Sequence, residues 1–166
     1  MRILIIDDEP RQRKSLSELL RRLKEYETIE CKNGNDALEI VRAQPLDCIL
    51  TDIQMPYISG LDLIRTLREE GCELPVVILS AHSQFEYAQE ALRYGVVEYL
   101  LKPVSSEKML LALSKVEQQL EKKQKNTQYY SNIETRLNKT IDIYINSRMC
   151  RLVQRTLSEN EKSELR

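Results

Sequence analysis

Short apolar runs alternate with helical stripes over residues 1–103, and this alternation restricts the fold more strongly than any other feature of the sequence. The first run, Ile3-Leu4-Ile5-Ile6, is mostly β-branched, which is typical of a strand buried on both faces of a parallel sheet. Further strands are predicted at residues 28–31, 47–51, 76–79 and 96–101. Helices are predicted at residues 11–24, 36–43, 61–70 and 84–94, and from about Ser105 onward. Five β-α units in succession predict an α/β fold in which helices cover both faces of an open parallel sheet.

Glycine, proline and charge divide the chain into two parts. All five prolines and all four glycines lie at or before position 103, so the rest of the chain contains no helix breaker. Residues 121–166 carry 10 basic and 6 acidic side chains, whereas residues 1–120 carry 15 basic and 20 acidic ones. We therefore predict an acidic compact domain at residues 1–120 and a basic helical linker or coiled-coil-like extension at residues 121–166.

The hydrophobic pattern of the extension is imperfect. A 3-4 spacing of mostly apolar residues runs from Leu113 to Tyr144, but its central positions are polar. This pattern favours a helix that dimerises. A flexible basic linker, a helix ordered only by a further domain, and a separate fold beginning at residues 141–145 are the alternatives.

Composition excludes several classes of protein. The net charge of −1 gives no overall electrostatic reason to bind nucleic acid or an anionic membrane. No apolar run approaches the ~20 residues that span a bilayer, and the acidic N-terminus is unlike a signal peptide. Four widely spaced cysteines and a single histidine argue against zinc sites and disulfide scaffolds. We therefore expect a cytoplasmic protein without membrane contact.

Polar side chains stand at the carboxyl ends of four predicted strands. Asp7 and Asp8 follow the first strand and Asp52 follows the third. Ser80 ends the fourth strand and Lys102 follows the fifth. Ligands of open α/β sheets bind outside the carboxyl ends of the strands, so we expect these five side chains to form one site.

This combination of side chains suits Mg²⁺-assisted phosphoryl chemistry. Carboxylates that repel one another bind a hard cation, and Mg²⁺ prefers oxygen ligands. A carboxylate such as Asp52 attacks phosphorus to form an acyl phosphate, while Lys102 neutralises charge on the phosphoryl oxygens and Ser80 donates a hydrogen bond. Taken singly, Asp7, Asp8 and Ser80 each fit a helix N-cap, and Lys102 fits an ordinary surface position. Their joint position at the strand ends favours the functional interpretation.

Residues 1–120 resemble the receiver domain of two-component response regulators. The resemblance rests on four stretches in matching order and spacing: Leu4-Ile5-Ile6-Asp7-Asp8-Glu9-Pro10, Leu50-Thr51-Asp52-Ile53-Gln54-Met55-Pro56 with Gly60, Leu79-Ser80-Ala81, and Tyr99-Leu100-Leu101-Lys102-Pro103. It implies a flavodoxin-like five-stranded parallel sheet with the strand order 2-1-3-4-5, for which the chemotaxis receiver is a known example.

The resemblance also implies a role for each residue of the predicted site. Asp52 is the phosphoacceptor, which takes its phosphoryl group from a sensor histidine kinase. Mg²⁺ is held by Asp8, by Asp52 and by the backbone carbonyl of Gln54, and Asp7 acts partly through a metal-bound water. Lys102 pairs with Asp52 or with its phosphoryl group.

Further implications concern the switch, the phosphoryl lifetime and one peptide bond. Ser80 is the switch hydroxyl, and the rotamer of Tyr99 follows its movement. Gln54 and His82 tune the lifetime by controlling access of water, although an exposed loop position is an equal alternative for His82. The bond between Lys102 and Pro103 is cis in this family.

The expected output is transcriptional. The stretches at residues 83–88 and 98–103 are similar to receivers that precede AraC-type DNA-binding domains. DNA would then be contacted only through a domain outside this chain. A homodimer is expected through the face formed by the fourth helix, fifth strand and fifth helix, or through the C-terminal helix. The alternatives are a phosphate-independent interaction module and, less favoured because Gln54 stands where a second acid is needed, a Mg²⁺-dependent phosphohydrolase. As a receiver, the chain would catalyse only its own phosphorylation and dephosphorylation.

Overall fold

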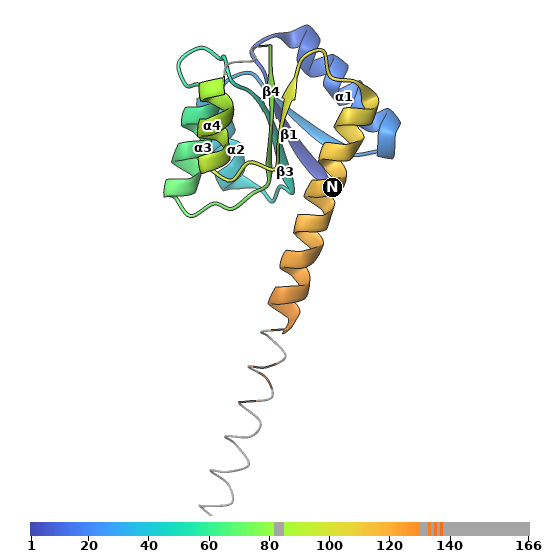
Figure 1. The fold of residues 1–166 in the computed structure, drawn as a ribbon, viewed down its shortest axis with the longest axis vertical. Coiled ribbons are helices and arrows are strands. Elements are labelled where there is room, and N and C mark those ends of the chain that lie inside the picture. The colour runs from blue at the N-terminus through green and yellow to red at the C-terminus, as the bar shows by residue number, and fades with distance from the viewer. Residues whose placement is uncertain (82–84, 130–132, 134, 136, 138–166) are drawn as a thin grey trace, which may run out of the picture. The chain divides into compact units, whose positions relative to one another are not determined.

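Five parallel strands form one sheet with the order β2-β1-β3-β4-β5 (Figure 1). The computed structural model describes residues 1–81 and 85–129, together with residues 133, 135 and 137. The strands are β1 (Arg2–Ile6), β2 (Glu27–Cys31), β3 (Cys48–Asp52), β4 (Val76–Ser80) and β5 (Glu98–Leu101). The predicted fold class and strand order are therefore confirmed.

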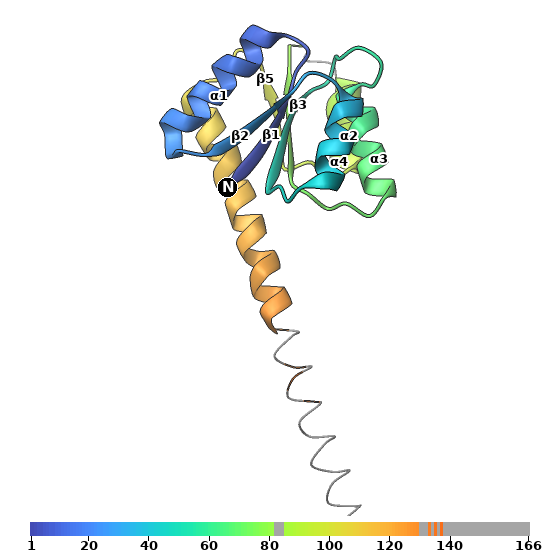
Figure 2. The same cartoon turned by 180° about the vertical axis from the view of Figure 1, so that it is seen from behind.

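Helices cover both faces of the sheet. Helices α2 (Gly34–Ala43), α3 (Gly60–Glu69) and α4 (Phe85–Arg93) lie on one face (Figures 1 and 2). Helix α1 (Pro10–Lys24) and residues 106–120, which are the part of a fifth helix that belongs to this domain and are called helix 106–120 below, lie on the other. The sheet is therefore the middle layer of a three-layer domain.

Successive strand residues supply two separate cores. Leu4 and Ile6 of β1 pack into the core beneath α2, α3 and α4, whereas Ile3 and Ile5 pack into the core beneath α1 and helix 106–120. All four side chains are at most 1% exposed. Since side chains of a strand alternate between its faces, a run that is apolar at every position is required wherever both faces are covered.

Two helix starts differ from the prediction because capping side chains extend the helices. Asn33 accepts a hydrogen bond from the Asp36 N–H at 2.9 Å, and α2 begins at Gly34 rather than at residue 36. Ser59 accepts one from the Asp62 N–H at 3.1 Å, and α3 begins at Gly60. Each cap satisfies one backbone N–H that the first turn leaves unpaired. The stretch 33–35, predicted as a turn, is therefore the start of a helix.

Strand β5 begins two residues later than predicted. The Val96 N–H still bonds to the Ala91 carbonyl at the end of α4, at 3.3 Å, and only the Val97 N–H turns to Val76 of β4, at 2.8 Å. The regular ladder then runs from Glu98. The apolar pair 96–97 therefore serves the connection from α4 rather than the strand.

The chain divides into two units, Met1–Leu120 and Glu121–Arg166. In the second unit, residues 121–129, 133, 135 and 137 are helical. The stretch 141–145, where a separate fold was the alternative, lies outside the described residues. Leu113 and Val116, the first positions of the predicted seam, are fully buried in the core of the first unit. They belong to the core of this unit and not to a coiled-coil surface. No helix in the described part of the chain is both long and apolar enough to cross a membrane.

Candidate functional site

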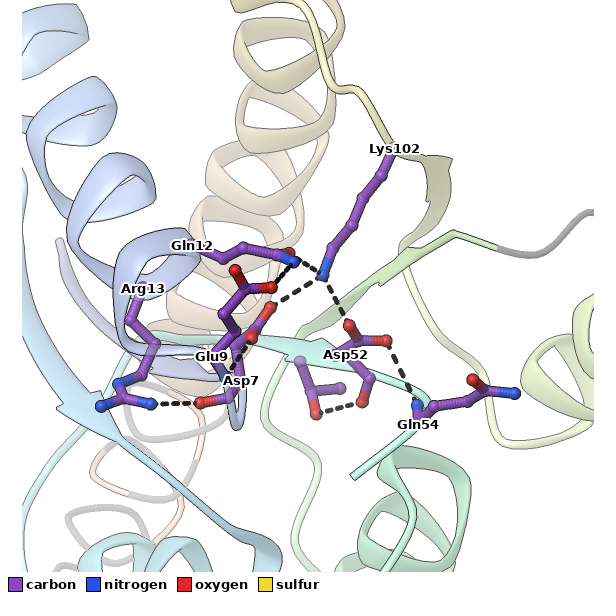
Figure 3. Close-up of polar contacts among 8 residues, drawn as sticks. Asp7, Glu9, Gln12, Arg13, Asp52, Gln54 and Lys102 are labelled. Carbon is purple, nitrogen blue, oxygen red and sulfur yellow. Dashed lines mark hydrogen bonds and ion pairs between the residues drawn. The ribbon is translucent and has the colours of Figure 1, made fainter. Parts of the chain in front are cut away.

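The carboxyl ends of β1, β3 and β5 bring three of the predicted residues together. Asp7 directly follows β1, Asp52 ends β3, and Lys102 directly follows β5. The Lys102 ammonium donates to Asp7 Oδ2 at 2.7 Å and to Asp52 Oδ2 at 2.5 Å (Figure 3). Residues 45 and more positions apart in the sequence therefore meet at one edge of the sheet, as the strand-end argument predicted.

The side chains of these ion pairs are largely shielded from water. The side chains of Asp7, Asp52 and Lys102 are 2%, 14% and 17% exposed. Burial alone would lower the pKa of the Lys102 ammonium, but the hydrogen bonds and charges of Asp52 and Asp7 outweigh it, and this pKa is raised. The lysine is therefore fully cationic at neutral pH, so that a positive charge stands permanently beside the Asp52 carboxylate.

A third oxygen contacts the ammonium, and the sequence analysis did not identify its owner. Gln12, in the first turn of α1, accepts from Lys102 Nζ at 2.5 Å and donates from its amide nitrogen to Glu9 (Figure 3). Arg13 donates to the Asp7 backbone carbonyl at 2.6 Å. Neither residue belongs to the quoted motifs. The one available signal was helical spacing, which places the first turn of α1 beside the acids that precede it.

The backbone around Asp52 is held by its neighbours. The Gln54 N–H donates to Asp52 Oδ1 at 3.2 Å, and the Thr51 hydroxyl donates to the Asp52 carbonyl at 2.9 Å. The Gly60 N–H donates to the Ile53 carbonyl at 2.8 Å, which brings the start of α3 against the end of β3. A Cβ added at Gly60 would lie 2.0 Å from the Asp52 carbonyl oxygen. This position therefore requires glycine.

The other described residues predicted for the site are not among the side chains that the Lys102 ammonium contacts. Asp8 is exposed, whereas Ser80 is 1% exposed and its carbonyl accepts from the Lys102 N–H at 2.8 Å. Tyr99 is half-buried and packs against the core beneath α2–α4. His82 lies outside the described residues. The peptide bond between Lys102 and Pro103 is cis, as expected.

The alternative interpretation of the acids as helix N-caps is wrong for α1. Glu9 occupies the cap position of α1 and makes no capping hydrogen bond with its side chain. Asp7 Oδ1 instead accepts from the Glu9 N–H at 2.9 Å, while its Oδ2 pairs with Lys102. Both Asp7 oxygens are therefore used within the site.

The donor set agrees with a magnesium site in chemical type. In the described part of the chain, no three histidine, cysteine, aspartate or glutamate side chains converge closely enough to hold a metal ion. Asp7 and Asp52 share the Lys102 ammonium, and Asp8 lies one residue from Asp7 on the exposed side. Carboxylates are ligands that Mg²⁺ prefers, and few are needed because Mg²⁺ binds few protein ligands and keeps several waters.

Comparison with known proteins places this geometry in a family. The profile of the response regulator receiver domain matches residues 3–114. The positive alginate biosynthesis regulatory protein of Pseudomonas aeruginosa is 38% identical over 117 residues, which are 69% of this chain and 46% of that protein. Chemotaxis protein CheY-3 of Vibrio cholerae is 34% identical over 122 residues, covering 72% of this chain and 94% of that protein. The chain belongs to the response regulator receiver family.

Solved structures agree with this assignment. The response regulator TrrA of Thermotoga maritima, in complex with Mg²⁺ and BeF, superimposes with a TM-score of 0.63 and 30% identity. The match covers 69% of this chain and 97% of that one. Receiver domains generally bind Mg²⁺, interact with sensor histidine kinases and are not enzymes in their own right. The chain spans less than half the length of the Pseudomonas relative.

Proposed function

We propose that this chain is a phosphorylation-activated receiver module in which Asp52 accepts a phosphoryl group from a sensor histidine kinase. The observation that carries this proposal is the half-buried Lys102 ammonium, which donates to Asp7 and Asp52 at the carboxyl edge of the sheet. A cation fixed beside a carboxylate stabilises the charge on a transferring phosphoryl group.

Mg²⁺ is proposed to be held by Asp8, Asp52 and the backbone carbonyl of Gln54, with Asp7 contributing partly through water. The bound ion would supply charge neutralisation for the phosphoryl oxygens. Asp8 is the exposed member of this set, and Asp52 is the partly buried one. An ion between them would therefore keep an open side for waters and phosphoryl oxygens.

The proposed transfer conserves charge and atoms. A carboxylate oxygen of Asp52 forms a bond to phosphorus, while the bond between phosphorus and the donor breaks and the donor leaves with its electron pair. For a phosphohistidine donor, the leaving nitrogen takes a proton from solvent. Lys102 keeps its proton throughout and pairs with the phosphoryl oxygens. Later attack by water releases phosphate and regenerates the Asp52 carboxylate, at a rate that Gln54 and His82 are proposed to tune.

The conformational response is proposed to run from Ser80 to Tyr99. The Ser80 hydroxyl would move to the phosphoryl group, and Tyr99 would turn inward behind it. The Ser80 carbonyl already accepts from the Lys102 backbone N–H, which supports a close coupling between the ends of β4 and β5. This movement would reshape α4, β5 and helix 106–120.

The output is proposed to be transcriptional and to use a homodimer. The proposed interface carries five exposed apolar side chains on α4, at the end of β5 and on helix 106–120: Phe85, Leu92, Leu101, Leu110 and Leu111. Association would remove this apolar area from water. The C-terminal extension is the second proposed contact, and DNA would be contacted by a further domain of AraC type.

The experiment that tests the proposal measures intact mass after incubation with acetyl phosphate, with and without Mg²⁺. One phosphoryl adduct that needs Mg²⁺ is expected on the wild type and not on Asp52→Asn. Asp47→Asn is the matched control, because Asp47 precedes β3 at the opposite edge of the sheet and its carboxylate accepts from the Arg2 N–H at 2.7 Å. This variant is expected to be phosphorylated normally.

Two results would contradict the proposal. A folded wild type without any adduct would favour the phosphate-independent interaction module. Sustained turnover of p-nitrophenyl phosphate that depends on Asp52 would favour the phosphohydrolase. Size measurement on the phosphorylated sample then tests the proposed dimer.

A further inference from the structure

The Lys102 ammonium uses all its hydrogen-bond donors before any phosphoryl group is present. A lysine ammonium has three N–H donors. In this structure they face Asp7 Oδ2 at 2.7 Å, Asp52 Oδ2 at 2.5 Å and Gln12 Oε1 at 2.5 Å. Two of these acceptors are charged, and Gln12 is the neutral third.

The Gln12 amide is itself held in a single orientation. Its oxygen faces an ammonium, which only donates, and its nitrogen faces the Glu9 carboxylate, which only accepts (Figure 3). The Glu9 N–H in turn donates to Asp7 Oδ1 at 2.9 Å. A closed ring of hydrogen bonds therefore runs from Asp7 through Lys102, Gln12 and Glu9 back to Asp7.

We propose that Gln12 is a positioning residue for phosphoryl uptake, which holds the Lys102 ammonium beside Asp52 through its Oε1 atom. This inference rests on the proposed function of Asp52. When the phosphoryl group arrives, the donor that faces Asp52 turns to a phosphoryl oxygen, while the donors to Asp7 and Gln12 stay in place. The ammonium is then already oriented, and little reorganisation is needed during transfer.

The neutrality of Gln12 matters for this role. An acid at position 12 would hold the ammonium equally well, but it would add negative charge to a site that must attract an anionic phosphoryl donor. The amide fixes the ammonium without that repulsion. Gln12 is half-buried in the first turn of α1, so its side chain is restricted by the helix as well as by its two partners.

The first test observes the ammonium directly, without metal or phosphodonor. Nitrogen-15 NMR of the lysine ammonium groups in the full chain measures how fast the Lys102 protons exchange with solvent. Gln12→Met, which keeps length and helix propensity but replaces the amide, is expected to accelerate exchange. Gln12→Glu keeps an oxygen acceptor and is expected to retain slow exchange. Gln44→Met, at the half-buried glutamine that follows α2 as its C-cap, is the control and should match the wild type.

The second test measures the rate of phosphoryl uptake from acetyl phosphate with saturating Mg²⁺. Gln12→Met is expected to be slowed about tenfold, the size of effect expected when one hydrogen bond to a charged group is lost. In a Lys102→Met background the same substitution is expected to change the rate no further, because its effect passes through the lysine.

Each outcome decides the inference. Unchanged ammonium exchange in Gln12→Met overturns the contact, and faster exchange with an unchanged uptake rate overturns the positioning role. An effect that persists without Lys102 assigns Gln12 to another route and also overturns the proposal. A wild type that takes up no phosphoryl group refutes the proposed function and the uptake role with it, and the NMR result then decides only the Gln12 contact.

Discussion

Replacing Gly60 by alanine is the substitution most sharply constrained by the structure. The added Cβ would lie 2.0 Å from the Asp52 carbonyl oxygen and 3.1 Å from the Thr51 hydroxyl. Ordinary carbon–oxygen contacts are at about 3.3 Å or more. The oxygen or the start of α3 must therefore shift by roughly 1.3 Å, and both are main chain.

The expected change in the unfolding free energy of Gly60→Ala results from two opposing effects. Overpacking a rigid site typically costs about 1–3 kcal/mol, and a contact with a strand carbonyl belongs near the upper end. Alanine gains at most about 1 kcal/mol over glycine from helix propensity. The net loss of unfolding free energy is therefore about 2 kcal/mol, or a fall of about 8 °C in Tm for a domain of this size.

Gly34 provides the matched control for this substitution. Like Gly60, it is the first residue of a helix and directly follows the capping side chain. Its added Cβ would meet Ile58 Cβ and Cγ2 at 3.0 Å and the Ile58 carbonyl oxygen at 3.3 Å, contacts that a shift of a few tenths of an ångström relieves, so Gly34→Ala is expected to cost less than about 1 kcal/mol. Urea unfolding followed by circular dichroism compares both variants with the wild type. Equal midpoints for Gly60→Ala and the wild type would refute the reasoning.

Further expectations concern groups away from the phosphoryl site. Burial and the hydrogen bond to Glu117 raise the pKa of Tyr26 to about 12, so the stability that wild type gains over Tyr26→Phe should persist below pH ~10 and decline between about 10 and 12. Unfolding midpoints across that range, with absorbance titration of the tyrosines, check this sign. Arg68 donates to three backbone carbonyls at 2.7, 2.9 and 3.1 Å, and Arg68→Met should lower the unfolding free energy by about 1–3 kcal/mol in a denaturant titration. Burial raises the pKa of the Cys48 thiol to about 12, so peptide mapping after mild alkylation should find the half-buried Cys72 modified well before Cys48.

The sequence predicted the fold because the decisive information was local. A run such as Ile3–Ile6 that is apolar at every position has one stable environment, a strand covered on both faces, and five repeats determine the layers. The boundaries were less certain because capping depends on where a side chain points. Asn33 was compatible with a turn until its bond to the Asp36 N–H assigned it to the start of α2.

The candidate site likewise contains residues that could be predicted from the sequence and one that could not. Asp7, Asp52 and Lys102 were predictable because strand ends of a parallel sheet converge whatever the details of packing. Gln12 was not, because a glutamine in a first helical turn is usually solvated, and its place in the site depends on the rotamer of a lysine 90 positions away. A contact that depends on two side-chain rotamers cannot be predicted from the periodicity of a sequence.

Substitutions of Asp52 and of Lys102, the two partners of the central ion pair, are expected to have different effects on folding. In Asp52→Asn, the Lys102 ammonium would keep Asp7 and Gln12 as acceptors, so the buried charge stays compensated and the fold should be largely preserved. In Lys102→Met, the Asp7 carboxylate at 2% side-chain exposure would lose its cation, and an uncompensated buried charge is strongly destabilising. A loss of phosphoryl uptake in Lys102→Met therefore combines lost catalysis with altered folding, and it has to be compared with the measured unfolding free energy. The same loss in Asp52→Asn reports on the acceptor alone, because Lys102 and Asp7 still neutralise each other in that variant.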